Sequence, residues 1–191
     1  MAVRFVVFAS GSGSNFEALV KATQNGDLDA QCVGLIVDRM DAYAIKRARH
    51  LNIPVCLYLK DWYMNKEAME SSMLKQIQAW DAEWIVCAGY MRIIGKTLLE
   101  AFPNKIVNIH PSLLPKYRGK DALGQALQAK DKILGITVHF VDDGLDTGKI
   151  IDQVSFELAG NEPRIEVETK LHHLEHAFYP KVLKQLWEVK P

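Results

Sequence analysis

Asn108 and His110 are candidate catalytic residues, because both are polar and they lie two positions apart at the end of an apolar, strand-forming run, 105–110. Side chains two positions apart in a strand project to the same face, so these two lie together while Val107 and Ile109 face the other way. An amide NH2 can donate to a developing oxyanion, and an imidazole moves protons near neutral pH. A hydrogen-bonded core histidine beside a turn asparagine is the alternative, and the pair alone leaves both interpretations open.

An acidic loop at 142–148 supplies three carboxylates and two glycines between two apolar runs. A plain turn, a metal loop and a site for an orienting carboxylate all fit this composition, whereas the spacing excludes an EF-hand. In the preceding run, Thr137 and His139 share one face of the expected strand. Polar side chains therefore accumulate toward the same end of the sheet as Asn108 and His110.

A glycine-rich segment at 10–15, Ser-Gly-Ser-Gly-Ser-Asn, follows the first apolar run and opens the first helical pattern. Glycines let the backbone approach an anion, and the free amides of a helix start carry partial positive charge. The segment is therefore a candidate phosphate loop, with Ser14 and Glu17 spaced as a capping box. Phe16 stands where a dinucleotide fingerprint needs glycine, and a tight turn that binds nothing is the alternative.

Short Val-rich, Ile-rich and Phe-rich runs alternate with longer helical patterns, which predicts a mostly parallel α/β sheet with helices on both faces. Expected strands are 3–8, 31–37, 54–57, 84–88 and 105–110, followed by two adjacent strands at 135–141 and 149–156 that are antiparallel additions. Expected helices are 15–24, 41–51, 64–79, 96–101 and 122–130, with a C-terminal helix beginning near 162. In open α/β sheets ligands bind beyond the carboxyl ends of the strands, so the loops 10–14, 111–119 and 144–148 are the places expected to form a site.

Length and composition favour one domain that acts on small molecules. The chain has 191 residues, 49% of them hydrophobic, and 23 basic side chains balance 23 acidic ones. This balance argues against a nucleic-acid partner, and the sequence shows neither a signal-peptide layout nor a membrane-length apolar stretch, so we expect a cytoplasmic protein. Cys32, Cys56 and Cys87 are isolated in apolar segments, which predicts reduced thiols rather than disulfides or metal ligands.

Five segments together resemble the phosphoribosylglycinamide formyltransferases of the folate-dependent formyltransferase family. They are Gly-Ser-Asn at 13–15, Gly-Tyr-Met-Arg-Ile-Ile at 89–94, Asn-Ile-His-Pro-Ser-Leu-Leu-Pro at 108–115, Thr-Val-His-Phe-Val at 137–141 and Leu-Asp at 145–146. Their order and spacing match throughout, and the likeness covers essentially the whole chain. The resemblance implies a single Rossmann-like domain over 1–191, with a phosphate-binding and acceptor-binding half at 1–100 and a catalytic and folate-binding half at 101–191.

The same resemblance implies formyl transfer from 10-formyltetrahydrofolate to the amine of glycinamide ribonucleotide, without a metal. The implied catalytic residues are Asn108, His110 and Asp146. The implied contacts to the ribonucleotide are Gly13, Ser14, Asn15 and Glu175. The implied contacts to the folate, largely through backbone groups, are Met91, Arg92, Ile93, Ile94, Val141, Asp142, Asp143, Gly144 and Leu145.

The chain departs from the relatives at two places, 119–124 and the pair His172 and His173, so the roles of these residues stay open. Two other functions also stay open. Another formyl-folate enzyme, such as a deformylase, would share the chemistry, and a non-catalytic nucleotide-binding protein would use the polar residues of the sheet only for structure. The sequence leaves the oligomeric state undecided.

Overall fold

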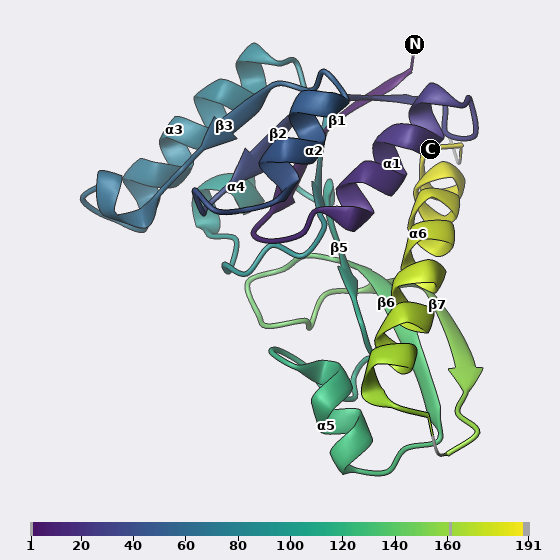
Figure 1. The fold of residues 1–191 in the computed structure, drawn as a ribbon. Coiled ribbons are helices and arrows are strands. Elements are labelled where there is room, and N and C mark those ends of the chain that lie inside the picture. The colour runs from purple at the N-terminus through teal and green to yellow at the C-terminus, as the bar shows by residue number, and fades with distance from the viewer. Residues whose placement is uncertain (1, 161, 189–191) are drawn as a thin grey trace.

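The computed structural model describes residues 2–160 and 162–188 and is built on a mixed β-sheet (Figure 1). The strands are β1 (Val3–Ala9), β2 (Ala30–Val37), β3 (Val55–Leu57), β4 (Trp84–Cys87), β5 (Ile106–His110), β6 (Ile133–Phe140) and β7 (Ile150–Glu157). They lie in the order β3-β2-β1-β4-β5-β6-β7. The first five pair in parallel, whereas β6 and β7 join as antiparallel strands, which confirms the expected fold class.

Helices cover both faces of the sheet. They are α1 (Ser14–Gln24), α2 (Ala44–His50), α3 (Lys66–Ala79), α4 (Lys96–Ala101), α5 (Ala122–Gln128) and α6 (Arg164–Glu188), with a short 3-10 helix η1 (Lys60–Trp62). Residues of α1, α2, α5 and α6 share one hydrophobic core, and residues of α3 and α4 share the other. Figure 1 shows α1 beside the long α6, and the two helices are in contact.

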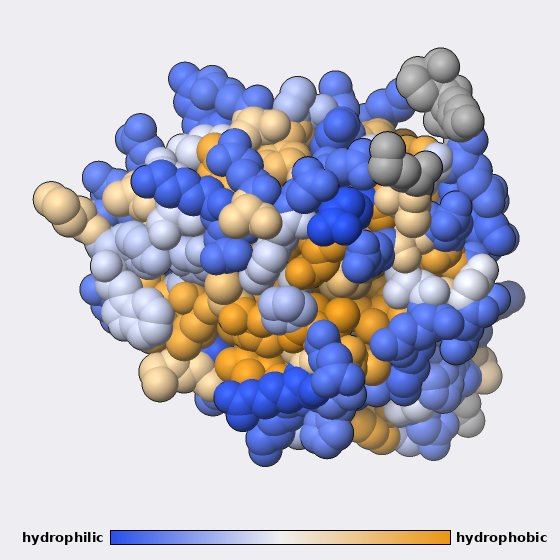
Figure 2. Space-filling view, turned by 90° about the horizontal axis from the view of Figure 1, so that it is seen from above, coloured by the Kyte–Doolittle hydropathy of each residue, from blue (hydrophilic) through white to orange (hydrophobic). Residues whose placement is uncertain are grey.

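Strand β1 shows why apolar runs form the centre of this sheet. Phe5 and Val7 face the core under α1 and α6, while Val6 and Phe8 face the core under α3 and α4, and all four are fully buried. A central parallel strand needs apolar side chains on both faces, so it reads as a continuous hydrophobic run. Figure 2 shows one outer face of the molecule, where hydrophobic residues gather in the middle and polar ones surround them.

The strand order reverses between β1 and β4, and this topological switch point is where open α/β sheets bind ligands. The loops after β1 and β4 therefore open toward a common space, and the polar end of β5 is their neighbour. No helix in the part of the chain that the structure describes is long and apolar enough to cross a membrane.

The expected capping box at Ser14 and Glu17 is wrong. Gly13 takes the N-cap position in the left-handed conformation, with φ of 71°, and no side chain caps the helix. The Glu17 carboxylate instead pairs with Lys21 at 2.9 Å and with Arg47 of α2. Ser14 is already helical, so its hydroxyl is one position too late to act as the cap.

Other differences concern element ends. Helix α3 begins at Lys66 instead of 64 because the Asn65 side chain caps it, accepting from the Ala68 amide at 2.8 Å. Helix α6 begins at Arg164 instead of 162 because the Glu162 carboxylate accepts the amides of Ala159 and Gly160 at 2.9 and 2.8 Å. Helix α2 begins at Ala44 rather than 41, and η1 was not predicted.

Candidate active site

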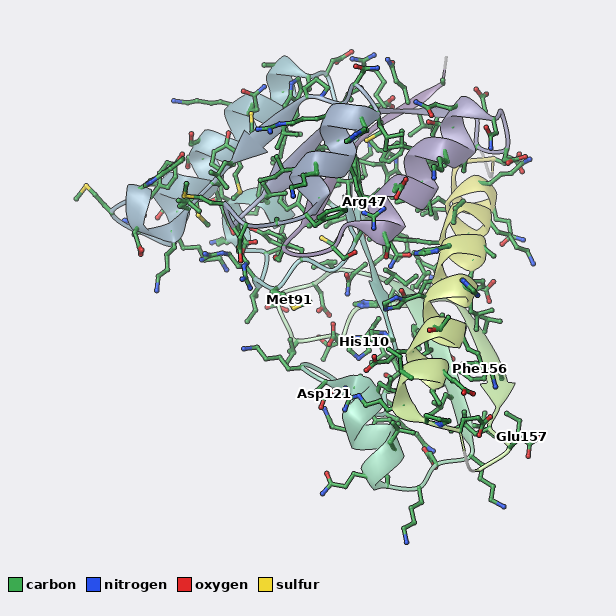
Figure 3. All side chains as sticks on the ribbon, in the orientation of Figure 1. Arg47, Met91, His110, Asp121, Phe156 and Glu157 are labelled. Atoms are coloured by element: carbon green, nitrogen blue, oxygen red, sulfur yellow. The ribbon has the colours of Figure 1, made fainter. Side chains whose placement is uncertain are left out.

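A cavity of about 1030 Å³ lies at the carboxyl ends of β1, β4 and β5. Residues of α6 and of the loop between β6 and β7 complete its wall. Figure 3 labels Met91, His110 and Asp121, which line this cavity from three separate elements. Of the residues expected in a site, those that line it are Gly13, Ser14, Asn15, Met91, Arg92, Ile93, Ile94, Asn108, His110, Val141, Asp142, Gly144, Leu145, Asp146 and Glu175, whereas Asp143 does not.

Asn108 lies opposite His139 in the antiparallel pairing of β5 with β6. The His139 Nδ1 atom is 2.8 Å from the carbonyl oxygen of Phe140, and its Nε2 atom is 3.2 Å from Asn108 Nδ2. Burial lowers the pKa of His139, which favours a neutral ring. With its proton on Nδ1 the ring donates to Phe140, so Nε2 accepts from the amide of Asn108. Among the described residues the second N–H of Asn108 has no partner, so it can donate to a ligand.

His110 follows on the same face of β5 and is 5% exposed. Its Nε2 atom is 2.8 Å from the carbonyl oxygen of Tyr117, and its Nδ1 atom is 3.4 Å from Asp146 Oδ2. Both ring nitrogens therefore face acceptors, an arrangement that a doubly protonated imidazolium satisfies. Asp146 also accepts the Gly119 amide at 2.8 Å, and its other oxygen is 3.7 Å from His139 Nε2.

Thr137 shares a face with His139, as expected, but it serves the fold. It is fully buried, donates to the Ser112 carbonyl at 2.7 Å and accepts from the Leu114 amide at 3.0 Å. The Gln153 side chain of β7 donates to the same hydroxyl at 2.8 Å. These bonds hold the segment that follows His110 against the sheet.

The three carboxylates of the acidic loop 142–148 make different contacts. Asp142 accepts the Gly144 amide at 3.1 Å and the Thr147 hydroxyl at 2.7 Å, which makes a local turn. Asp143 does not line the cavity. Only Asp146, which adopts a left-handed φ of 51°, comes within ion-pair distance of His110 and His139.

The loop at the start of α1 faces the cavity through residues 10–15. The Asn15 amide donates to Glu175 Oε2 of α6 at 2.9 Å, and its Oδ1 atom is buried without a hydrogen-bond partner among the described residues. Glu175 is 7% exposed, and burial raises the pKa of its carboxyl. A buried acceptor and a buried acid at one end of the cavity suit a ligand that carries N–H or O–H donors.

The segment after β4 forms an apolar wall. Met91 and Ile93 are 67% and 57% exposed, whereas Ile94 is buried. The Met91 amide donates to the Ser10 hydroxyl at 2.8 Å, which ties this wall to the glycine-rich segment 10–15. Ser10 was not among the expected site residues, although it lies in the glycine-rich segment that the sequence singles out.

Asp38 does not line the cavity but holds Arg92, which does, and it was not expected from the sequence. It lies directly after β2, is buried, and accepts from Arg92 Nε at 2.7 Å. An acidic residue at the carboxyl end of an apolar strand was a signal that could have found it. His139 was expected only as a polar residue of β6, and the structure alone places it between Asn108 and Asp146.

Residues 119–123 of the unassigned segment 119–124 line the cavity, and Figure 3 labels Asp121 at the start of α5. Asp121 caps α5 by accepting the Gly124 amide at 3.2 Å, and it pairs with Arg164 of α6 at 2.8 Å. Arg164 also pairs with Glu168 at 2.7 Å. Of the two unassigned histidines, His172 lines the cavity.

The described residues contain no group of three or more His, Cys, Asp or Glu side chains placed to hold a metal ion. Cys32 and Cys87 are buried, and burial raises the pKa of each thiol to about 12. Both are therefore inert apolar side chains at neutral pH.

Comparison with known proteins gives one consistent result. Residues 3–183 match the formyl transferase family. The chain is 47% identical over 183 residues to phosphoribosylglycinamide formyltransferase of Bacillus subtilis, covering 96% of this chain and 94% of the relative. It is 35% identical to the enzyme of that name from Haemophilus influenzae, covering 97% and 87%. The crystal structure of glycinamide ribonucleotide transformylase 1 from Geobacillus kaustophilus superposes with a TM-score of 0.94 at 47% identity, covering 97% of this chain and 99% of that one.

Proposed function

Because the chain belongs to the formyl transferase family, we infer that it transfers the formyl group of 10-formyltetrahydrofolate to the amine of glycinamide ribonucleotide, a step of purine biosynthesis. One observation carries the inference from the structure. Asn108, His110 and Asp146 converge on a single cavity, between the phosphate loop and the apolar wall after β4.

We propose that the two substrates enter this cavity from opposite ends. The amides of Gly13, Ser14 and Asn15 hold the phosphate of the ribonucleotide, because the first amides of α1 are free donors. Glu175 contacts the same substrate beside Asn15. The pterin lies against residues 91–94 and 141–145, whose backbone groups and apolar side chains suit a flat heterocycle.

We also propose that residues 1–100 bind mainly the acceptor, whereas residues 101–191 carry catalysis and folate binding. The lining of the cavity departs from this division at two residues. The phosphate loop and the catalytic trio follow that division. Glu175, however, comes from the second half to the acceptor end, and Met91 comes from the first half to the folate end.

The reaction exchanges one carbon–nitrogen bond for another. The acceptor amine attacks the formyl carbon, which gives a tetrahedral intermediate with a negative oxygen and a positive nitrogen. The bond from the carbon to N10 of the folate then breaks, and the formyl group stays on the acceptor. The acceptor nitrogen loses one proton and N10 gains one, so the protein must stabilise the oxyanion and move a proton.

Asn108 and His110 are proposed to stabilise the oxyanion. Asn108 has a second amide N–H beyond its bond to His139, and His110, whose ring nitrogens face Tyr117 and Asp146, places a positive charge beside the oxyanion when it is protonated. Donors aimed at a charge that develops in the transition state contribute about 3 kcal/mol each in comparable sites. Asp146 is proposed to orient the ring and to collect the proton from the acceptor nitrogen, directly or through water.

Incubation of the pure protein with 10-formyltetrahydrofolate tests the proposed reaction. We expect the folate absorbance to change only when glycinamide ribonucleotide is also present. A change without the acceptor would identify a deformylase, and no change under either condition would identify a binding protein without catalysis.

Gly11→Val is expected to raise the KM for the ribonucleotide at least about 10-fold while it changes the KM for the folate little. Gly11 lines the cavity, and a Cβ at this position meets nothing within 4 Å, so the fold accepts the substitution. Because Gly11 lines the cavity beside residues 12–15, the added side chain is expected to crowd the acceptor end. Steady-state kinetics with each substrate varied in turn provides the measurement.

Gly13→Val is unsuitable for the same test, because a Cβ at Gly13 would lie 2.8 Å from the Cα atom of Ala44 and the residue has a positive φ. A loss of activity there would reflect a damaged loop. Equal changes of both KM values in Gly11→Val would remove the loop from the acceptor end.

We further propose that the protein acts in the cytoplasm as a small-molecule enzyme without nucleic-acid or membrane partners. The balanced charge of the chain supports this, because a nucleic-acid partner requires an excess of basic side chains.

A further inference from the structure

The backbone of residues 117–119 contacts both ionisable members of the proposed trio. The carbonyl oxygen of Tyr117 lies 2.8 Å from His110 Nε2, and the amide of Gly119 donates to Asp146 Oδ2 at 2.8 Å. A short stretch of chain therefore fixes one ring nitrogen of the histidine and one oxygen of the carboxylate. The placement of His110 relative to Asp146 depends on the conformation of this stretch.

The conformation of that stretch is costly without support. Tyr117 has a φ of 55°, in the left-handed region that residues with a Cβ rarely adopt, and Gly119 has a φ of 79°. Left-handed backbone at a non-glycine residue costs about 1 kcal/mol or more, so it persists only where surrounding contacts hold it. Something outside the cavity must therefore keep the Tyr117 carbonyl directed at His110.

Asp131, just after α5, supplies that support. Its Oδ2 atom accepts from the Tyr117 hydroxyl at 2.8 Å and from Lys116 Nζ at 3.0 Å. The hydrogen bond from Tyr117 and that from Lys116 lower the pKa of Asp131, so the group is a carboxylate at neutral pH. The Asp131 amide in turn donates to the Ala126 carbonyl at 3.1 Å, which anchors it to the end of α5.

We propose that Tyr117 and Asp131 are positioning residues for the formyl transfer, acting through the Tyr117 carbonyl on His110. The phenol and the carboxylate lie behind the cavity wall and do not line the cavity, so neither is placed to touch a substrate. The hydrogen bond between Tyr117 and Asp131 holds the backbone of Tyr117 in place, and the Tyr117 carbonyl oxygen in turn positions the ring of His110. The inference rests on the proposed roles of His110 and Asp146.

Tyr117→Phe is the direct test, because it removes the hydroxyl and keeps the ring that packs against the core. We expect kcat to fall about 10-fold while both KM values stay within about twofold of the parent, since misplaced catalytic groups cost turnover rather than ground-state binding. The ¹⁵N resonance of His110 Nε2 should shift as well, because its hydrogen bond to the Tyr117 carbonyl is disturbed. A parental kcat, or a rise in KM alone, would overturn the proposal.

Tyr58→Phe is the matched control. Tyr58 is another phenol that donates to a backbone carbonyl, that of Ser72 at 3.3 Å, and it lies in the core on the opposite face of the sheet. We expect parental kcat and an unshifted His110 resonance in this variant. An equal loss of kcat in Tyr58→Phe would show that general destabilisation explains both results and would overturn the proposal.

The pairing of Tyr117 with Asp131 gives a second test. Asp131→Ala should lower kcat at least as much as Tyr117→Phe, because it also removes the contact with Lys116. The double variant should be no worse than Asp131→Ala alone, because that substitution already removes the hydrogen bond lost in Tyr117→Phe. Asp131→Asn keeps an oxygen acceptor for the phenol and should restore most of the lost kcat. Additive losses in the double variant would contradict the proposal.

His110→Ala separates failure of this inference from failure of the proposed function. If His110→Ala is inactive while Tyr117→Phe is fully active, the positioning role alone is wrong. If His110→Ala keeps parental turnover, the proposed role of the histidine is wrong, and with it the basis of the inference.

Discussion

Asp146→Asn is expected to lower kcat about 100-fold or more, the range typical for loss of a catalytic acid or base. The carboxamide keeps the size of the side chain and can still accept the Gly119 amide. It loses the negative charge that lies 3.4 Å from His110 Nδ1 and that can take a proton from the acceptor nitrogen. Steady-state turnover of the variant provides the measurement.

Asp142→Asn and Asp143→Asn are the controls from the same loop. The Asp142 carboxylate is engaged by Gly144 and Thr147 within the loop, so its replacement should loosen the proposed pterin site and raise the KM for the folate. Asp143 does not line the cavity, and its replacement should have the smallest effect of the three. If Asp143→Asn abolished turnover while Asp146→Asn stayed active, the catalytic carboxylate would have to be reassigned.

Asn108→Ala should lower kcat about 100-fold with little change in the dissociation constants of both substrates. The amide is proposed to donate to an oxygen that is charged only in the transition state, so its loss does not weaken the ground-state complex. The hydrogen bond from Asn108 Nδ2 to His139 Nε2 fixes the orientation of the amide, because a neutral histidine accepts at this nitrogen. The substitution therefore removes a donor that is already oriented. Pre-steady-state turnover together with equilibrium titration of each substrate provides the measurement.

Thermal unfolding of Asn108→Ala serves as the check on the fold. The substitution leaves His139 Nε2 without its partner, so a fall in the unfolding midpoint must be separated from the fall in turnover. A folded variant with near-parental kcat would show that another donor holds the oxyanion.

The order of elements and the loops that form the cavity were predictable from the sequence. Within the apolar runs 3–8 and 31–37, residues 5–8 and 32–37 are buried in the central sheet, and this burial on both faces requires the continuous hydrophobic pattern that predicts them. Element ends were less predictable. The start of α1 depends on the left-handed conformation of Gly13, and the start of α6 depends on the hydrogen bonds from the Ala159 and Gly160 amides to Glu162. The hydrophobic pattern encodes neither.

Residue types and strand periodicity are enough to place Asn108 and His110 on one face, because side-chain direction in a strand repeats every two residues. The spacing within a strand does not predict which other strand pairs with it. The antiparallel pairing of β5 with β6 brings His139 to Asn108, and the left-handed turn at Asp146 selects this carboxylate from the three of its loop.

The sequence by itself therefore determined the α/β class, the end of the sheet at which the candidate cavity lies and, by resemblance, the family. Only the tertiary structure decided what holds the proposed catalytic groups. Tyr117 and Asp131 are 14 positions apart, and their link to His110 runs through a backbone carbonyl, a group that every residue possesses. Backbone groups leave no signature in a sequence, so a contact that depends on them becomes visible only when the chain is folded.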